Sequence, residues 1–499
     1  MTQFLINNMA PIIFAFMVIF MLVGFPVAFA LAANGVVFGL IGIELGLIGP
    51  QIFQALPDRV FGVMSNDTLL AIPFFTFMGL ILERSGMAED LLDTIGQLFG
   101  PLRGGLAFAV IFVGALLAAT TGVVAASVIS MGLISLPIML RYGYDKRLAS
   151  GVIAASGTLA QIIPPSLVLI IMADQLGRSV GDMYKGAFIP GFVLTGLYVG
   201  YVVLITLFKP SHAPALPPEA RSLRGAKLLL RVLTTLVPPL FLIFLVLGTI
   251  FLGIATPTEG GAMGATGALI MAIMRKRLSW SLLKQAMETT AKLTTFVVFI
   301  LVGARVFSLT FYGVDGHRWV EHLLTDLPGG EVGFLIVTNI LIFFLAFFLD
   351  FFELSFIVVP LLGPVADKLG IDLIWFGVLL AVNMQTSFMH PPFGFALFYL
   401  RSVAPASIKT TDIYWGAIPF VCIQIIMVGL VIMFPQMVTF GLDKDVAVDL
   451  DKVIIDMPDS GYGVPETPPG ISLTPEEGST AEDDANKAIM DSMKQDAAK

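Results

Sequence analysis

Apolar runs long enough to cross a lipid bilayer recur along most of this chain. A transmembrane helix needs about 20 predominantly apolar residues, and such runs begin at residue 12 and recur to residue 437. The first run, residues 12–31, has no basic segment before it and is followed at once by another apolar run. It is therefore predicted to be a retained helix rather than a cleaved signal. The pattern predicts an all-α polytopic membrane protein.

A block of the chain recurs at an offset of 227 residues. The matched positions are Pro101 and Pro328, Pro137 and Pro364, Gly143 and Gly370, Asp145 and Asp372, and Pro164-Pro165 and Pro391-Pro392. The motif Gly-Ala-Phe-Ile-Pro at 186–190 is answered, after a small slip, by Gly-Ala-Ile-Pro at 416–419. A single matched glycine or proline carries little weight. One offset shared by this many positions, with a double proline in register, indicates an internal repeat.

Each copy of the repeat has the same predicted order of elements. A spanning helix and an amphipathic segment are followed by two apolar pieces, a helix interrupted by Pro-Pro, and a last span. The apolar elements cover 69–82, 106–140, 146–175 and 187–208 in the first copy, and 294–310, 334–366, 372–401 and 414–435 in the second. Two connecting spans lie at 235–252 and 257–274. If the paired pieces form a re-entrant hairpin, each copy crosses the membrane three times. The two connecting spans return the chain to the same side, so the second copy begins on the opposite face from the first and the repeat is inverted.

The basic residues test this topology. It places 14 Lys and Arg residues on one face and leaves five on the other, which are Arg59, Arg178, Lys185, Arg318 and Lys368. Cytoplasmic loops carry an excess of Lys and Arg. The first face is therefore predicted to be cytoplasmic and both termini periplasmic, in a bacterial inner membrane.

The chain is predicted to divide into five parts. These are N-terminal scaffold helices and an interfacial arm (1–66), the first repeat (67–208; hairpin about 106–140, broken helix about 146–177), a basic linker with two connecting helices and an arm (209–292), the second repeat (293–440; hairpin about 334–366, broken helix about 372–403) and an acidic tail (441–499). The amphipathic stretches 51–66, 88–99 and 279–292 are predicted to lie along the membrane interface as arms.

Composition narrows the classes of function. Only 13% of the residues are charged, and the single cysteine excludes a disulfide framework. There is neither a phosphate-binding Gly-x-x-x-x-Gly-Lys-Ser/Thr motif nor a His-Glu-x-x-His motif, so no ATPase, transition-metal or enzymatic role is expected. Residues 443–499 hold 14 acids and 5 bases and are predicted to be a solvated, disordered tail. Nucleic acid is not an expected partner; membrane lipid is.

The breaks in the two repeats are the candidate sites. Inverted repeats with broken helices place a solute site near the bilayer midplane, where freed carbonyls and helix N-termini meet cations and anions. The first hairpin breaks at 118–127, around Thr120, Thr121, Gly122 and Ser127, and small-residue helix packing is the alternative explanation. The interrupted helices break at 158–166 and 383–392, and a simple proline kink is the alternative there.

Several charged residues have two explanations each. Asp350 and Glu353 interrupt the second hairpin, where an acid compensates a bound cation or pairs structurally. Glu259 serves either in transport or as a helix cap. Arg305 binds the carboxylate or sulfonate of a solute, or it neutralises Asp350 or Glu353, with the structural pairing favoured. His390 is a proton-sensitive group or a structural donor.

These motifs resemble the large membrane subunit of tripartite ATP-independent periplasmic (TRAP) transporters. The matching segments are Gly-Tyr-Asp at 143–145, Gln-Ile-Ile-Pro-Pro-Ser at 161–166, Gly-Ile-Ala-Thr-Pro-Thr-Glu at 253–259, Phe-Leu-Asp at 348–350 and Pro-Pro-Phe-Gly at 391–394. Gln161, Glu353 and the stretch 385–387 resemble the mannitol/chloroaromatic branch. The acidic tail departs from the usual length of the family.

The resemblance implies a sodium-coupled elevator that imports a small organic acid. A periplasmic binding protein would deliver the acid, and a small four-helix membrane subunit would widen the scaffold. The resemblance carries sodium binding onto Thr120, Thr121, Gly122, Ser127, Thr158, Gln161, Pro164, Asp350, Glu353, Asn383, Gln385, Thr386, Ser387 and Pro391. It carries solute binding onto Thr121, Ser127, Pro165, Ser166, Arg305, Asp350 and Pro392. The alternative is a stand-alone cation-coupled anion symporter of similar fold that needs no binding protein.

Overall fold

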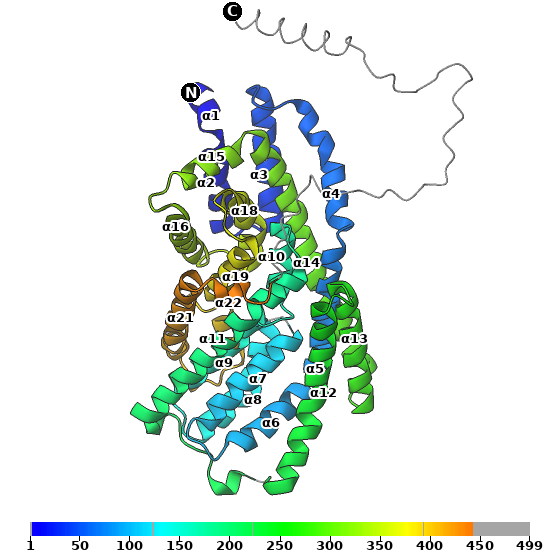
Figure 1. Cartoon of the computed structure of the whole chain (residues 1–499), viewed down its shortest axis with the longest axis vertical. Helices are drawn as coiled ribbons and strands as arrows, with labels where there is room; N and C mark the ends of the chain where they lie inside the picture. Colours follow the sequence, from blue (N-terminus) through cyan, green and yellow to red (C-terminus); the bar gives the residue numbers. More distant parts are fainter. Residues whose placement is uncertain (1, 122–123, 222, 393, 443–499) are drawn as a thin grey trace, which may run out of the picture. The chain divides into compact units, whose positions relative to one another are not determined.

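The computed structural model describes residues 2–121, 124–221, 223–392 and 394–442, and every regular element in these ranges is a helix (Figure 1). Within these ranges, six helices are long and apolar enough to cross a membrane, and two bent helix pairs raise the number to eight if each pair is one span. The chain is therefore a multi-pass α-helical membrane protein, as predicted.

The N-terminal apolar run is broken in two. α2 (Met9–Leu22) ends before Gly24, whose φ is +88°, and α3 (Val27–Glu44) begins after Pro26. A left-handed glycine and a proline end a helix because neither continues the regular hydrogen-bonding pattern. The prediction of one helix over residues 12–31 is therefore wrong.

Two predicted interfacial arms are continuous, or nearly so, with the spans that follow them. The segment from η1 (Pro50–Ala55) through α4 (Leu56–Met64) meets η2 (Asp67–Leu70) and α5 (Ala71–Arg84) at a bend of only 41°. Residues 279–292 form the first turns of α14 (Trp280–Gly313), a single helix of 34 residues. No Gly or Pro separates this amphipathic segment from the span, so the helix continues without a turn. The third stretch is a separate helix, α6 (Met87–Phe99).

The first repeat contains a helical hairpin and an interrupted helix. Its elements are α7 (Gly105–Thr121) and α8 (Val124–Arg141), then α9 (Lys146–Thr158), η3 (Leu159–Gln161) and α10 (Leu167–Leu176), then α11 (Val180–Phe208). A connection through η4 (Pro210–His212), η5 (Pro218–Ala220), α12 (Gly225–Phe251) and α13 (Pro257–Met274) leads to α14.

The second repeat has the same order of elements, and its list begins one element earlier, with α15, the counterpart of α6. Its elements are α15 (Gly316–Thr325) and α16 (Gly330–Leu345), then α17 (Phe351–Glu353), the π-helical η6 (Leu354–Val358) and α18 (Val359–Lys368), then α19 (Leu373–Met384), η7 (Gln385–Phe388) and α20 (Phe395–Val403), then α21 (Thr410–Met433) and α22 (Gln436–Thr439). The predicted fold class, inverted repeats that each hold a hairpin and a broken helix, is confirmed.

The matched Gly and Asp residues have one structural role in both copies. Gly143 and Gly370 have φ of +82° and +77°, a conformation that glycine adopts without steric cost. Two residues later, Asp145 accepts hydrogen bonds from Arg147 N and Leu148 N, and Asp372 accepts one from Trp375 N. Each motif is thus a left-handed turn followed by an N-cap, which starts the broken helix of its repeat.

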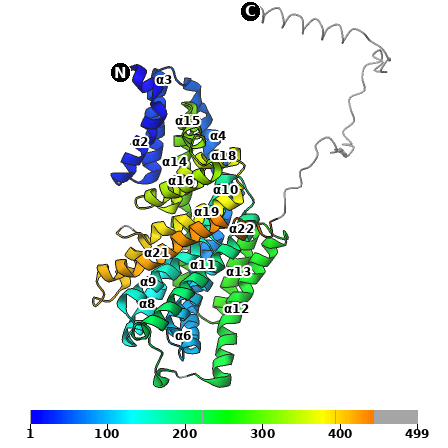
Figure 2. The same ribbon diagram turned by 60° about the vertical axis from the view of Figure 1, so that its left-hand side comes forward.

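The two repeats pack through a glycine contact between α9 and α21, which lie side by side in Figure 2. A Cβ atom at Gly151 would lie 2.1 Å from the carbonyl oxygen of Gly416, and one at Gly416 would lie 2.2 Å from that of Arg147. Only glycine allows the two backbones to approach so closely. The recurring Gly-Ala motif therefore marks the place where the second repeat crosses the first.

The remaining helices form a scaffold beside the repeats. α3 packs against α14, and α13 packs against α5 and α12. Gly303 belongs to the first contact, since a Cβ there would lie 2.4 Å from the carbonyl oxygen of Ala28.

Candidate functional site

The centre of the candidate site is the pair of interrupted helices. In the first, residues 162–166 lie outside any helix between η3 and α10; in the second, the helix stops after Phe388 and resumes at Phe395. Pro164-Pro165 and Pro391-Pro392 are both joined by cis peptide bonds. Non-helical backbone is tolerated at membrane depth only where it is buried in protein or lines a cavity.

The two breaks meet through equivalent residues. Gln385 Nε2 donates a hydrogen bond of 2.8 Å to the backbone oxygen of Thr158, and both residues are fully buried. The Thr158 hydroxyl donates to Ala155 O at 2.8 Å and accepts from Gln424 Nε2 at 3.4 Å. Thr158, predicted to bind a cation, thus joins the two repeats.

Gln424 and Tyr198 belong to this centre but were not predicted from the sequence. Gln424 Nε2 lies 3.0 Å from the Tyr198 hydroxyl, and both side chains are fully buried, on α21 and α11. Neither residue stands beside a Pro, Gly or charged motif. The one available signal was a glutamine in the middle of an apolar span, where polar groups are costly.

Two glutamines at the breaks carry buried polar atoms without a partner. Gln161 is 1% exposed, and neither its amide nitrogen nor its amide oxygen has a hydrogen-bond partner in the described part of the chain. Gln385 Oε1 is in the same situation. An unsatisfied buried polar atom costs about 1–3 kcal/mol. These atoms therefore point to a polar ligand or ion at the breaks.

Short polar side chains around the breaks bond locally. Ser166 Oγ donates to Gln161 O, Thr386 Oγ1 to Asn383 O at 2.7 Å, and Ser387 Oγ to Met384 O at 2.7 Å. A hydroxyl that donates its proton keeps two lone pairs. These oxygens therefore remain potential ligands of a hard cation.

Asn383 ties the second break to the second hairpin. Its Nδ2 donates to the backbone oxygen of Asn339 at 2.8 Å and to Asn339 Oδ1 at 2.9 Å. Asn339, on α16, was not predicted from the sequence. The amide nitrogen of Asn383 thus has a structural role.

The tip of the second hairpin carries two carboxylates without a cation. Asp350 Oδ1 accepts from Glu353 N and Glu353 Oε2 accepts from Asp350 N, both at 3.0 Å, which forms a reciprocal capping box at the start of α17. No Lys, Arg or His nitrogen lies within 4.0 Å of either carboxylate in the residues that the structure describes. The rings of Phe351 and Phe388, 6.3 Å apart, connect this tip to the second break.

The first hairpin tip is described only in part. Gly122 lies outside the described residues, and of Thr120 and Thr121 the structure gives only the helical backbone at the end of α7. Ser127 is buried on α8. The next residue, Val128, packs on α9 so closely that a Cβ at Gly157 would lie 2.3 Å from it. This hairpin therefore lies directly against the first interrupted helix.

The proline residues predicted at the site differ in exposure. Pro164 and Pro165 are buried, Pro391 is half-buried and Pro392 is exposed. The carbonyl oxygen of Pro392 accepts a hydrogen bond of 3.2 Å from Tyr414 Oη. Next to this pair, the ring of His390 lies 4.1 Å from Phe347 and 4.4 Å from Phe343, centroid to centroid, and packs as part of an aromatic cluster.

Arg305 does not neutralise the hairpin acids. No carboxylate lies within 4.0 Å of its guanidinium in the described ranges, so the favoured pairing with Asp350 or Glu353 is wrong. The residue lies on α14 and lines a separate pocket with Arg59 and Gln175. The sequence shows at which depth of a span a charged residue lies, but it does not show which neighbouring helix that residue faces.

Glu259 is a helix cap at an exposed position. Its Oε2 accepts from Thr256 N at 2.8 Å, and Glu259 N donates to Thr256 Oγ1 at 3.2 Å. The capping explanation accounts for this acid.

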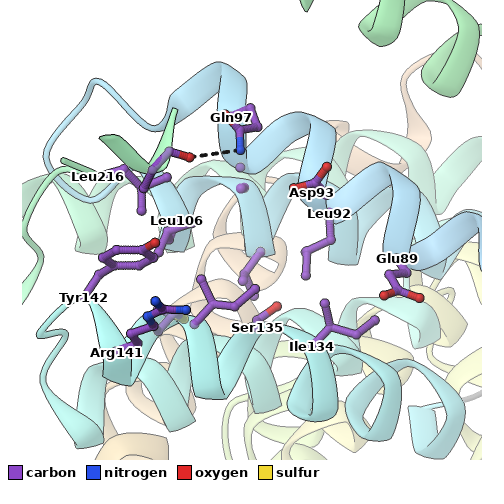
Figure 3. A pocket seen from close by; sticks show the side chains of 16 residues that line it. Glu89, Leu92, Asp93, Gln97, Leu106, Ile134, Ser135, Arg141, Tyr142 and Leu216 are labelled. Atoms are coloured by element: carbon purple, nitrogen blue, oxygen red, sulfur yellow. Dashed lines mark hydrogen bonds between the residues drawn. The ribbon is translucent and has the colours of Figure 1, made fainter. Parts of the chain in front are cut away.

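A further pocket lies between α6 and the first hairpin (Figure 3). Figure 3 shows Arg141 and Tyr142 at one end of it, Glu89 at the other, and Ser135 on its floor. Ser135 is eleven residues beyond the start of α8, or about 16 Å along the helix axis. This pocket is therefore remote from the hairpin tip and the breaks.

Comparison with known proteins decides the family. The model of the DctM component of tripartite ATP-independent periplasmic transporters matches residues 14–437. The chain belongs to this family. The TRAP large permease DctM for C4-dicarboxylates of Pseudomonas aeruginosa is 29% identical over 78% of this chain and 89% of its own length. The isethionate TRAP permease DctMQ of Oleidesulfovibrio alaskensis is 26% identical over 80% and 61%.

Among solved structures, the YdaH transporter of Alcanivorax borkumensis has a similar fold. Its TM-score is 0.55 at 16% identity, over 77% of this chain and 88% of YdaH. Relatives in the family are named as transport permeases. This TRAP permease is accordingly a transport protein and not an enzyme, and membership of the family implies a small membrane subunit and a periplasmic binding protein.

Proposed function

We propose that this TRAP permease imports a small organic acid together with sodium ions, by an elevator movement of the hairpins and broken helices along the scaffold. The solute, a carboxylate, keto acid or sulfonate, would come from a periplasmic binding protein. The relatives named for C4-dicarboxylates and for isethionate, a sulfonate, support this solute class.

One observation carries the proposal: two unwound helices meet next to a hairpin tip with two carboxylates, and no Lys, Arg or His of the described residues lies within 4.0 Å of either carboxylate. A buried acid is costly unless it is paired or binds a cation. Asp350 and Glu353 supply negative charge, while the carbonyl and hydroxyl oxygens of the breaks supply the ligands that a hard cation prefers. Sodium ions bound here would offset the negative charge of the two carboxylates. A sodium ion or the polar group of the solute at the breaks would also give the side-chain amide of Gln161 a partner.

The pseudo-symmetry supports an alternating movement. Because the two repeats are inverted, each hairpin approaches the centre from the opposite side. Sliding the hairpins and broken helices against α3, α5 and α14 would expose the centre to one side of the membrane or the other. The basic face predicted from Lys146, Arg147 and the α12–α14 connections would be cytoplasmic.

The test is uptake in liposomes that contain this chain and its small subunit, with the binding protein added outside. We expect a radiolabelled solute from a panel of dicarboxylates, keto acids and sulfonates to accumulate under an inward sodium gradient and not under an equal potassium gradient. Equal uptake with both cations would contradict sodium coupling. Full uptake without the binding protein would favour the stand-alone symporter.

A further inference from the structure

Two arginines without carboxylate partners line one pocket between the scaffold and the moving elements. Arg59 on α4 and Arg305 on α14 come from helices that the proposal treats as the static scaffold. Gln175 on α10 comes from the first broken helix, and Phe356 and Pro360 come from the second hairpin. The pocket has a volume of about 250 Å³. Its wall therefore includes both parts that an elevator would move against each other.

The charge in this pocket is of one sign. Its lining residues include no Asp or Glu, and no carboxylate lies within 4.0 Å of either guanidinium in the described portion of the chain. Asp174, next to Gln175 in the sequence, accepts hydrogen bonds from Asn66 Nδ2 at 2.5 Å and from Gln175 Nε2 at 2.7 Å, and it is not among the residues that line the pocket. Unpaired guanidinium groups in a confined space attract an anion.

The remaining polar groups suit an oxyanion. Arginine presents a planar fork of N–H donors that matches carboxylate and sulfonate oxygens. Ser308 and Tyr312 follow Arg305 at helical spacings of three and seven residues and line the same wall. Tyr312 Oη lies 3.4 Å from Pro360 O, which ties this wall of the scaffold to the return limb of the second hairpin.

From this geometry we infer that the pocket formed by Arg59, Arg305, Gln175 and Ser308 binds the carboxylate or sulfonate group of the organic acid before it reaches the helix breaks. The inference rests on the proposed function for the direction of passage. Arg59, Arg178, Arg318 and Lys368 mark the periplasmic side in that proposal, so the pocket would be an entry site for a solute released by the binding protein.

The site is testable by charge-selective labelling of Ser308→Cys in a Cys422→Ser background, in the full chain purified in detergent. The reagents are anionic 2-sulfonatoethyl methanethiosulfonate, itself a sulfonate, and its cationic trimethylammonium analogue. We expect the anionic reagent to react faster. Arg305→Gln should lower the ratio of the two rates about tenfold, since loss of one nearby positive charge slows the anionic reagent and speeds the cationic one. Arg305→Lys, which keeps the charge, should lower it much less.

The matched control is Arg318→Gln on α15, which removes an exposed arginine that pairs with Asp315, the N-cap of the same helix. It should leave the ratio unchanged. Succinate and isethionate should slow labelling in the parent and not in Arg305→Gln. An equal ratio in Arg305→Gln and Arg318→Gln would overturn the site. Protection by phosphatidylglycerol, with none by the organic anions, would also overturn it, because the occupant would then be a lipid headgroup.

Uptake in liposomes separates this inference from the function on which it rests. Loss of the charge preference with sodium-dependent uptake intact would remove the entry site and leave the transport proposal standing. If the anionic reagent still reacted faster but liposomes showed no sodium-dependent uptake, the pocket would bind anions but sodium-coupled import would be contradicted. The pocket would then not be an entry site for sodium-coupled import.

Discussion

The side-chain amide of Gln385 donates a hydrogen bond of 2.8 Å to the backbone oxygen of Thr158, a residue 227 positions earlier in the chain. The same offset relates the two proline pairs. Equivalent positions of the two repeats therefore contact each other, which places the pseudo-two-fold axis between the breaks. The hydrogen bond between Gln385 and Thr158 therefore shows that the centre of the candidate site lies where the two copies of the sequence repeat meet.

Replacing Gln385 should weaken the junction of the repeats. Gln385→Met keeps the side-chain volume but leaves Thr158 O without its donor, and we expect a loss of about 1–3 kcal/mol in the free energy of unfolding. The measurement is the midpoint of thermal unfolding of the purified protein in detergent. Gln54→Met, at an exposed position, should not change the midpoint. Equal midpoints for the two variants would contradict the role of this hydrogen bond.

Gln161 should behave in the opposite way. Its buried amide has no hydrogen-bond partner among the residues that the structure describes, so Gln161→Leu removes an unsatisfied group and should leave the unfolding midpoint unchanged or raise it. Uptake should nevertheless fall at least tenfold, because the variant loses the side-chain amide that would contact the bound ion or solute. A variant that loses stability and transport together would indicate a structural residue.

Inverted topology predicts opposite accessibility for two exposed lysines. Lys146 begins α9 and Lys368 ends α18. In a Cys422→Ser background, Lys146→Cys should react with a membrane-impermeant maleimide only after the cells are opened, whereas Lys368→Cys should react in intact cells. Labelling of both residues from the same side would show that the two repeats are parallel.

Much of the fold was predictable because its signals are local. The Gly-x-Asp motif at 143–145 and 370–372 encodes a turn and an N-cap. The double prolines at 164–165 and 391–392 favour a break in the helix, although a third pair, Pro238-Pro239, lies inside the continuous helix α12. The candidate residues Thr158, Gln161, Gln385, Thr386 and Ser387 lie beside such signals. The structure places them together at or next to the breaks.

The failures concern contacts between distant segments. Arg305 faces Arg59 and Gln175 rather than Asp350, and Gln424 bonds to Tyr198; neither relationship has a trace in the sequence. The helix boundaries also depended on context. Residues 12–31 appeared continuous by hydropathy, yet Gly24 and Pro26 divide them, and the amphipathic residues 279–292 continue directly into α14.

Sodium dependence after neutralising Asp350 tests the account most directly. Asp350→Asn keeps an N-capping side chain but removes one charge from the hairpin tip. Glu259→Gln is the matched control, since Glu259 is part of a similar capping box at an exposed site. We predict that Asp350→Asn raises the sodium concentration for half-maximal uptake at least tenfold and that Glu259→Gln leaves it unchanged. An unchanged sodium dependence in folded Asp350→Asn would contradict a cation site at the junction of the second hairpin and the helix breaks.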